Sequence, residues 1–113
     1  MKKIEAIIKP FKLSQVKEAL HELGISGMTL IDVKGFGRQR GSTGGVETSE
    51  TYDDEFLAKM KVEIIVDGEN ENKAIEAIKK AAYSGKIGDG KIFIYNIDQV
   101  IRIRTGEKDS DAV

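Results

Sequence analysis

The most constraining feature of this sequence is a stretch, Leu57–Val66, in which apolar and charged side chains alternate. A period of two residues places alternate side chains on opposite faces of a β-strand. One face of this strand is therefore apolar and the other charged, as expected in a sheet with helices packed on one side. The apolar positions are Met60, Val62, Ile64 and Val66, and the charged ones are Lys59, Lys61 and Glu63.

Two stretches with a helical period lie on either side of this strand. Apolar residues recur every three or four positions from Leu13 to Leu23, and Gly24 suits the position just past a helix end. The same period recurs between Asn72 and Tyr83. Further strands are predicted from runs of β-branched and aliphatic residues at 3–9, 28–34, 91–97 and 100–104. The polar residues 107–113 are expected to form a loose tail.

The order of these elements is strand, helix, strand, strand, helix, strand, with one short extra strand. It predicts an α+β fold, a ferredoxin-like βαββαβ sandwich in which two helices cover one face of an antiparallel sheet. The 113 residues suit a single domain, 1–113. Several predicted strands carry apolar residues at neighbouring positions, which point to opposite faces of the sheet, such as Ile7 beside Ile8 and Phe93 beside Ile94. Both sheet faces therefore need burial. We therefore predict a homo-oligomer; the alternative is a monomer with a half-apolar sheet.

Composition excludes several classes of function. The 18 Lys and Arg residues nearly balance the 19 Asp and Glu residues, and the net charge of -1 gives no general attraction to nucleic acid or acidic membranes. The absence of Cys excludes disulfides, thiol nucleophiles and thiolate metal sites. No apolar run approaches the roughly 20 residues of a membrane helix, and the first residues do not resemble a signal peptide. A cytoplasmic protein without membrane insertion is expected.

A glycine-rich segment, Gly85–Lys91, reads GKIGDGK and formally satisfies the G-x-x-x-x-G-K spacing of a phosphate loop. However, Ile92 stands where that motif requires Ser or Thr to hold magnesium, and the segment runs from helix to strand, which is the reverse order. A P-loop NTPase is therefore not expected. Closely spaced glycines still let main-chain N–H groups converge on an anion, and Lys86 and Lys91 supply positive charge. The alternative is a plain turn between helix and strand.

A pair of arginines near the end of the chain is a second candidate for anion binding. Arg102 and Arg104 alternate with Ile101 and Ile103, and in a strand this spacing sends both guanidinium groups to one face. Two neighbouring guanidinium groups suit a polyphosphate. The alternative is a solvated edge strand whose charges discourage aggregation.

The stretch from 39 to 56 is too long for an ordinary connection. Its roughly 18 residues show little apolar periodicity, whereas connections are usually about four to six residues long. We interpret it as a flexible loop that contacts a protein partner; the alternative is that its acidic residues serve solubility alone. No catalytic constellation is found, because no nucleophile has a neighbouring base and His21, the single histidine, lies on a predicted helix. An enzyme, such as a small acyl- or phospho-hydrolase, is therefore not expected.

Several long segments of the chain resemble the PII family of nitrogen-regulatory signal transduction proteins, over roughly residues 1–107. They are KKIEAIIKPFKL at the start, GMTLIDVKGFGRQRG, YDDEFLAKMKVEIIV, GKIGDGKIFI and VIRIRTGE near the end. The resemblance implies a homotrimer with three nucleotide clefts between neighbouring subunits. It also implies that ATP and ADP compete there, and that 2-oxoglutarate binds beside Mg²⁺ and ATP to report nitrogen and energy status.

The resemblance further implies a role for individual residues. Arg38 would reach the phosphate chain, Gln39 would complete the coordination of Mg²⁺, and Lys59 would pair with a 2-oxoglutarate carboxylate. The residues implied at the nucleotide are Gly88, Asp89, Gly90 and Lys91 at the phosphates, Arg102 and Arg104 from the subunit across the cleft, and Thr29, Gly37 and Ile65 near the nucleoside.

The loop 39–56 departs from the family pattern and bears on the partner. Its centre reads GGVETS, without the arginine that in many relatives enters an ammonium channel, so a nitrogen-metabolism enzyme is a better expected partner than such a channel. Tyr52 matches the position of a tyrosine that some members have uridylylated, although its flanks here are acidic. An alternative function is a divergent sensor of the adenylate ratio, or of another metabolite, without a 2-oxoglutarate response.

Overall fold

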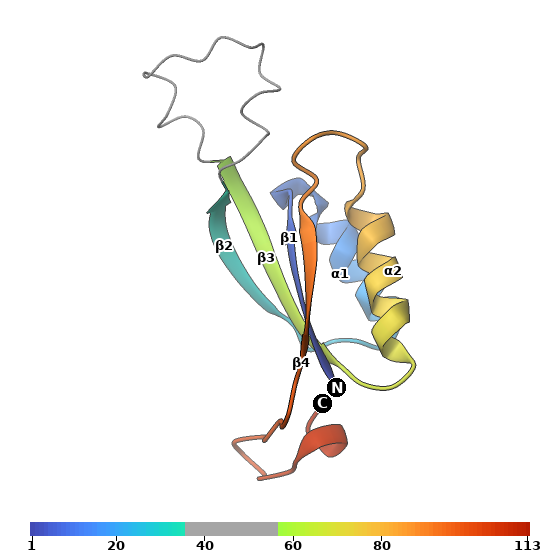
Figure 1. Cartoon of the computed structure of the whole chain (residues 1–113), viewed down its shortest axis with the longest axis vertical. Coiled ribbons are helices and arrows are strands. Elements are labelled where there is room, and N and C mark those ends of the chain that lie inside the picture. Colours follow the sequence, from blue (N-terminus) through green and yellow to red (C-terminus); the bar gives the residue numbers. More distant parts are fainter. Residues whose placement is uncertain (36–56) are drawn as a thin grey trace.

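The computed structural model describes residues 1–35 and 57–113 (Figure 1). In chain order the elements are β1 (Lys2–Ile8), the 3-10 helix η1 (Pro10–Lys12), α1 (Leu13–Glu22), β2 (Thr29–Gly35), β3 (Leu57–Val66), α2 (Asn70–Ala82), β4 (Lys91–Asn96) and the 3-10 helix η5 (Asp109–Asp111). The connection predicted between β2 and β3, including residues 39–56, lies outside the described residues.

The strands form one antiparallel sheet in the order β2-β3-β1-β4. The central strand β1 pairs on both sides, so that Ile4 lies opposite Ile64 on β3 and opposite Ile94 on β4. Both helices pack on the same face of this sheet (Figure 1). This arrangement confirms the predicted α+β, ferredoxin-like fold.

The hydrophobic core lies between the sheet and the two helices. The alternation in β3 predicted its inward residues, and Val62, Ile64 and Val66 are all buried. Each helix contributes the apolar stripe that its period of three and four predicted. The remaining core residues are Ile4, Ala6 and Ile8 from β1, Val16 and Leu20 from α1, Ile25, and Ala74, Ile78 and Ala82 from α2.

The open face of the sheet carries a belt of four charged side chains. Lys3 Nζ lies 3.3 Å from Glu63 and 3.6 Å from Glu5, and Lys61 Nζ lies 3.9 Å and 4.0 Å from the same two carboxylates. Apolar side chains flank this belt and stay exposed in the single chain. They include Ile31 on β2 and Phe93 and Tyr95 on β4. A face that is both apolar and ion-paired is suited to contact with another protein surface.

The segment 100–104 is not the strand that its alternation predicted. Ile101 forms a single bridge with Lys108, and the chain reverses between them, with Arg102 N donating to Glu107 O at 2.8 Å. Gly106 makes this reversal feasible because it adopts φ +74°, a left-handed conformation that favours glycine. Alternation alone predicted a strand, but a strand also needs a partner to pair with.

The end of the chain also differs from the loose tail expected for residues 107–113. The main-chain N–H of Asp109 donates to Val100 O at 2.8 Å, and Ser110 Oγ donates to Asp67 Oδ2 at 2.6 Å. These bonds dock η5 beside the loop between β3 and α2. In the described part of the chain, no helix combines the length and apolar character needed to span a membrane.

Candidate functional site

The glycine-rich segment forms a tight loop between α2 and β4. Gly85, Gly88 and Gly90 all adopt positive φ, at 82°, 100° and 96°. Gly90 has a second constraint, because an added Cβ would lie only 1.6 Å from the carbonyl oxygen of Ile7. The loop therefore touches β1 closely, and the next residue, Lys91, begins β4 by pairing with Ile7.

The side chain of Asp89 is turned inward and holds the loop together. Its carboxylate accepts hydrogen bonds from the main-chain N–H groups of Ser84, at 2.8 Å, and Gly85, at 2.9 Å, and from the Ser84 hydroxyl. Lys9 Nζ lies 3.2 Å from the same carboxylate. Burial raises the pKa of Asp89, but the Ser84, Gly85 and Lys9 donors outweigh it and hold this pKa well below its usual range. Asp89 is thus an anion within the described loop, and its carboxylate is already engaged by neighbouring donors.

Lys59 joins the glycine loop to the end of β3. Its side chain is buried, at 8% exposure, and its Nζ donates to the carbonyl oxygen of Gly88 at 2.7 Å. Burial lowers the pKa of Lys59, the positive charge of Lys9 lowers it further, and Asp89 partly offsets both. Its aliphatic stem packs against Gly35, where an added Cβ would lie 3.1 Å from Lys59 Cγ. Lys59 therefore connects the loop to the point where the described part of β2 ends.

A groove of about 410 Å³ lies beside this loop, between α2 and β4. Its walls are largely apolar, and at one end they include Asp89, Gly90 and Lys91. A cavity with apolar walls and a few polar groups at one end is a common form of ligand site. The apolar residues that line it are Ile7, Ile8, Ile75, Ile78, Ala82, Tyr83, Ile92 and Ile94.

Thr29 and Ile65 line a second cavity, of about 440 Å³, at the other end of the sheet. Thr29 lies opposite Glu63 in the β2·β3 register, and Glu63 also lines this cavity. Val100 and the last residue, Val113, form its remaining rim together with Lys3, Gly27, Met28, Ile64 and Ala112.

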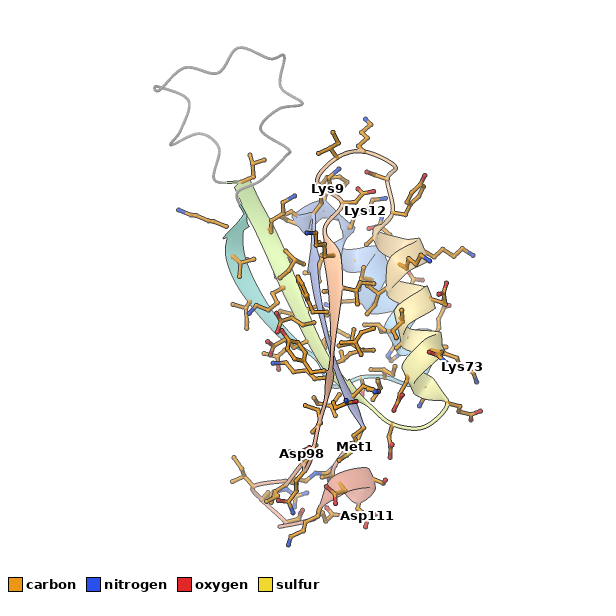
Figure 2. All side chains as sticks on the ribbon, viewed as in Figure 1. Met1, Lys9, Lys12, Lys73, Asp98 and Asp111 are labelled. Carbon is orange, nitrogen blue, oxygen red and sulfur yellow. The ribbon has the colours of Figure 1, made fainter. Side chains whose placement is uncertain are left out.

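The two arginines lie at the end of the sheet opposite the glycine loop. Figure 1 shows the loop at one end of β4 and the segment 100–113 at the other, and in Figure 2 the labelled Lys9 and Asp98 mark these two ends. A strand of the length of β4 spans about 20 Å, at roughly 3.3 Å per residue. Arg102 and Arg104 are both exposed, and Arg102 lies 3.2 Å from Glu107. A single chain therefore does not bring the arginines and the glycine loop together.

Part of the predicted site lies in residues 36–56, which the structure does not describe. Gly37, Arg38, Gln39 and Tyr52 lie outside the described residues. Among residues 1–35 and 57–113, no group of three or more His, Asp or Glu side chains is arranged to hold a metal ion.

Sequence reasoning did not name Lys9 or Ser84 as site residues. Lys9 follows β1 directly and precedes Pro10, and no local pattern distinguishes it from an ordinary surface lysine. Only the pairing of β1 with β4 brings it beside Asp89. Ser84 could have been found from its place at the end of α2, because Ser commonly bonds nearby main-chain groups where a helix gives way to a turn.

Comparisons with known proteins agree on one family. A family model described as Nitrogen regulatory protein P-II matches residues 1–107. Relatives named Nitrogen regulatory protein P-II from Azospirillum brasilense and Rhizobium meliloti (strain 1021) are 57% and 58% identical to this chain, with 100% of each protein covered. The crystal structure of Arabidopsis thaliana PII bound to citrate is 40% identical, with a TM-score of 0.82, covering 99% of this chain and 91% of that one.

Proposed function

Because the chain belongs to the nitrogen regulatory protein P-II family, we propose that it is a signal transducer that binds ATP or ADP and passes the ligand state to a partner protein. In this proposal, 2-oxoglutarate binds together with Mg²⁺ and ATP and reports nitrogen status. The protein acts in the cytoplasm, carries out no catalytic turnover, and contacts neither nucleic acid nor the membrane interior.

The observation that carries the nucleotide proposal is the glycine loop. Two of its glycines, Gly88 and Gly90, adopt positive φ, and Lys91 stands at its end. Successive amides and a neighbouring lysine form a concave site suited to a polyphosphate. In this proposal Lys59, whose Nζ donates to Gly88 O, would also pair with a carboxylate of 2-oxoglutarate. A solved relative is bound to citrate, itself a polycarboxylate.

The distance between the glycine loop and the other residues predicted to bind the nucleotide supports a cleft shared between two copies of the chain. The glycine loop lies at one end of the sheet, whereas Thr29, Ile65 and the two arginines lie at the other. A site assembled from opposite ends of a subunit requires a head-to-tail contact, and such contacts form a ring when the rotation between subunits closes. We propose a homotrimer in which Arg102 and Arg104 of one copy meet the loop of its neighbour. The open sheet face, with its exposed Phe93 and Tyr95, is the surface that such a ring buries.

The remaining contacts of the proposed site fall between residues 36 and 56. Arg38 would extend along the phosphates, Gly37 would lie near the nucleoside, and Gln39 would help to hold Mg²⁺. Because Gly35 and Leu57 are paired at the ends of β2 and β3, this connection starts and finishes beside Lys59. A ligand that binds there can bias the conformation presented to a partner. The partner is a nitrogen-metabolism enzyme or an ammonium channel, and Tyr52 is a site of modification.

Titration calorimetry tests this function directly. ATP and ADP should each bind and compete, and 2-oxoglutarate should release heat only when Mg²⁺ and ATP are present. A protein that binds neither nucleotide would overturn the proposal. If ATP binds with Mg²⁺ but 2-oxoglutarate gives no heat, the alternative of an adenylate-ratio or other-metabolite sensor replaces it.

A further inference from the structure

We propose that Asp89 is a positioning residue, whose carboxylate holds the loop 84–90 in the shape that presents main-chain amides to an anion. This inference rests on the proposed nucleotide function and assigns a specific task within it. Asp89 bonds three donors at the start of the loop while it occupies a position near the loop's end. Its carboxylate therefore ties the two ends of the turn together.

A carboxylate in a phosphate site poses an electrostatic problem, since like charges repel. The surroundings of Asp89 solve it by compensating the negative charge within the loop. Lys9 Nζ lies 3.2 Å away and supplies a full positive charge, and Lys9 also donates to Ser84 Oγ at 3.1 Å. Because Ser84 in turn donates to Asp89, these three side chains form a closed triangle of contacts. A charge matched in this way can shape an anion site without opposing the anion.

The peptide between Gly88 and Asp89 shows how the loop is oriented. A trans peptide is planar, so its C=O and N–H groups point in opposite directions. Lys59 Nζ holds the carbonyl oxygen of Gly88 at 2.7 Å, on the side of β3. The N–H of Asp89 is thereby aimed away from Lys59. Lys59 thus holds the main chain at Gly88, while Ser84 and Lys9 hold the side chain of Asp89.

The test compares ATP binding to the full-length protein and to the Asp89→Asn variant. Asparagine has nearly the same shape, but its NH₂ group would face donors where a carboxylate oxygen accepts them. We expect the Kd for ATP to rise by at least about tenfold, because the loop would no longer be held in the shape that we propose for anion binding. If the carboxylate instead faced the phosphates and repelled them, the same variant would bind ATP more tightly. An unchanged or lower Kd therefore overturns the proposal.

Variants at Ser84 keep the test valid if Asp89→Asn fails to fold. Ser84→Ala removes one donor and should weaken ATP binding by a smaller factor, whereas Ser84→Thr retains the hydroxyl and should restore affinity. Loss of affinity in both variants would contradict the assigned hydrogen bond. Glu76→Gln is the matched control, since it also neutralises one carboxylate but on the exposed side of α2. It should leave the Kd unchanged.

Amide hydrogen exchange separates this inference from the proposed function. In the protein without nucleotide, the N–H groups of Ser84 and Gly85 should exchange faster in Asp89→Asn than in the wild type, because their acceptor is weakened. Equal exchange rates would refute the role of Asp89 whatever the nucleotide result. A wild-type protein that does not bind ATP, with these amides protected, would refute the nucleotide function while leaving the loop architecture intact.

Discussion

Substitution of Gly90 by alanine is the sharpest structural test of the glycine loop. Gly90 combines a φ of +96° with an approach to β1 so close that an added Cβ would lie 1.6 Å from Ile7 O. Contacts of real Cβ atoms with such atoms essentially never fall below 3.0 Å, so the loop and β1 would have to separate by about 1.4 Å. That displacement would break the start of the β1·β4 pairing at Lys91.

The free-energy cost has two parts. The left-handed conformation costs an alanine about 1–2 kcal/mol. Loss of the hydrogen bonds that pair Lys91 with Ile7 adds about 1–2 kcal/mol, at roughly 1 kcal/mol per bond. We therefore expect Gly90→Ala to lower the free energy of unfolding by about 3 kcal/mol and to weaken ATP binding strongly.

Gly68→Ala is the control for the conformational part. Gly68 also has positive φ, at 58°, but an added Cβ there meets no atom within 4 Å. The Gly68→Ala variant should lose only about 1–2 kcal/mol of its free energy of unfolding. Both variants would be unfolded by urea at one fixed protein concentration, because the stability of an oligomer depends on concentration. Equal losses for the two glycines, or normal ATP binding by Gly90→Ala, would refute the close approach that we assign to this loop.

Three further predictions follow from other parts of the chain. Lys59→Met should abolish the heat of 2-oxoglutarate binding while weakening the binding of ATP by no more than about tenfold. Titration calorimetry resolves this pattern. The pKa of Asp67 is lowered chiefly by the Ser110 hydroxyl, then by the Gly68 amide and the N-terminus, against the effect of burial. Ionised Asp67 therefore stabilises the folded state at pH values above its ordinary pKa of 3.8. This contribution should be lost as the pH falls through the lower folded-state pKa, and urea titrations should show a weaker acid dependence in Ser110→Ala. Ile78→Ala should lower the free energy of unfolding by about 2–5 kcal/mol, because Ile78 is fully buried. A loss below about 1 kcal/mol would contradict its place in the core.

The sequence predicted those elements whose spacing of apolar residues agreed with the way they pack in the folded chain. The alternation in Leu57–Val66 and the helical stripe that includes Ile78 each bury the face that their period indicated. The segment 100–104 shows the limit of this reasoning, because it has the same alternation yet forms a turn. A period describes which face a strand would bury, whereas the existence of the strand depends on a partner edge.

The candidate site was predictable only in part, for a related reason. Closely spaced glycines identified the loop, since their conformational freedom is a property of single residues. The inward side chain of Asp89 was predictable only in part, because Ser84 and Gly85 are near in sequence but Lys9 reaches it only through the pairing of β1 with β4. The distance between the loop and Arg102 also depends on the whole sheet. Long-range pairing, and not residue type, decides which of the candidate residues can meet.

The central claim is that one nucleotide cleft needs two copies of the chain, and mixed oligomers test it most directly. One variant would carry Lys91→Ala in the loop, and the other Arg102→Ala with Arg104→Ala at the opposite end. Each alone should fail to bind ATP. In ring trimers reassembled from an equal mixture, about a quarter of the clefts should combine an intact loop with intact arginines, and calorimetry should recover ATP binding in that proportion. Mixtures that bind no more ATP than the separate variants would contradict a cleft shared between neighbours.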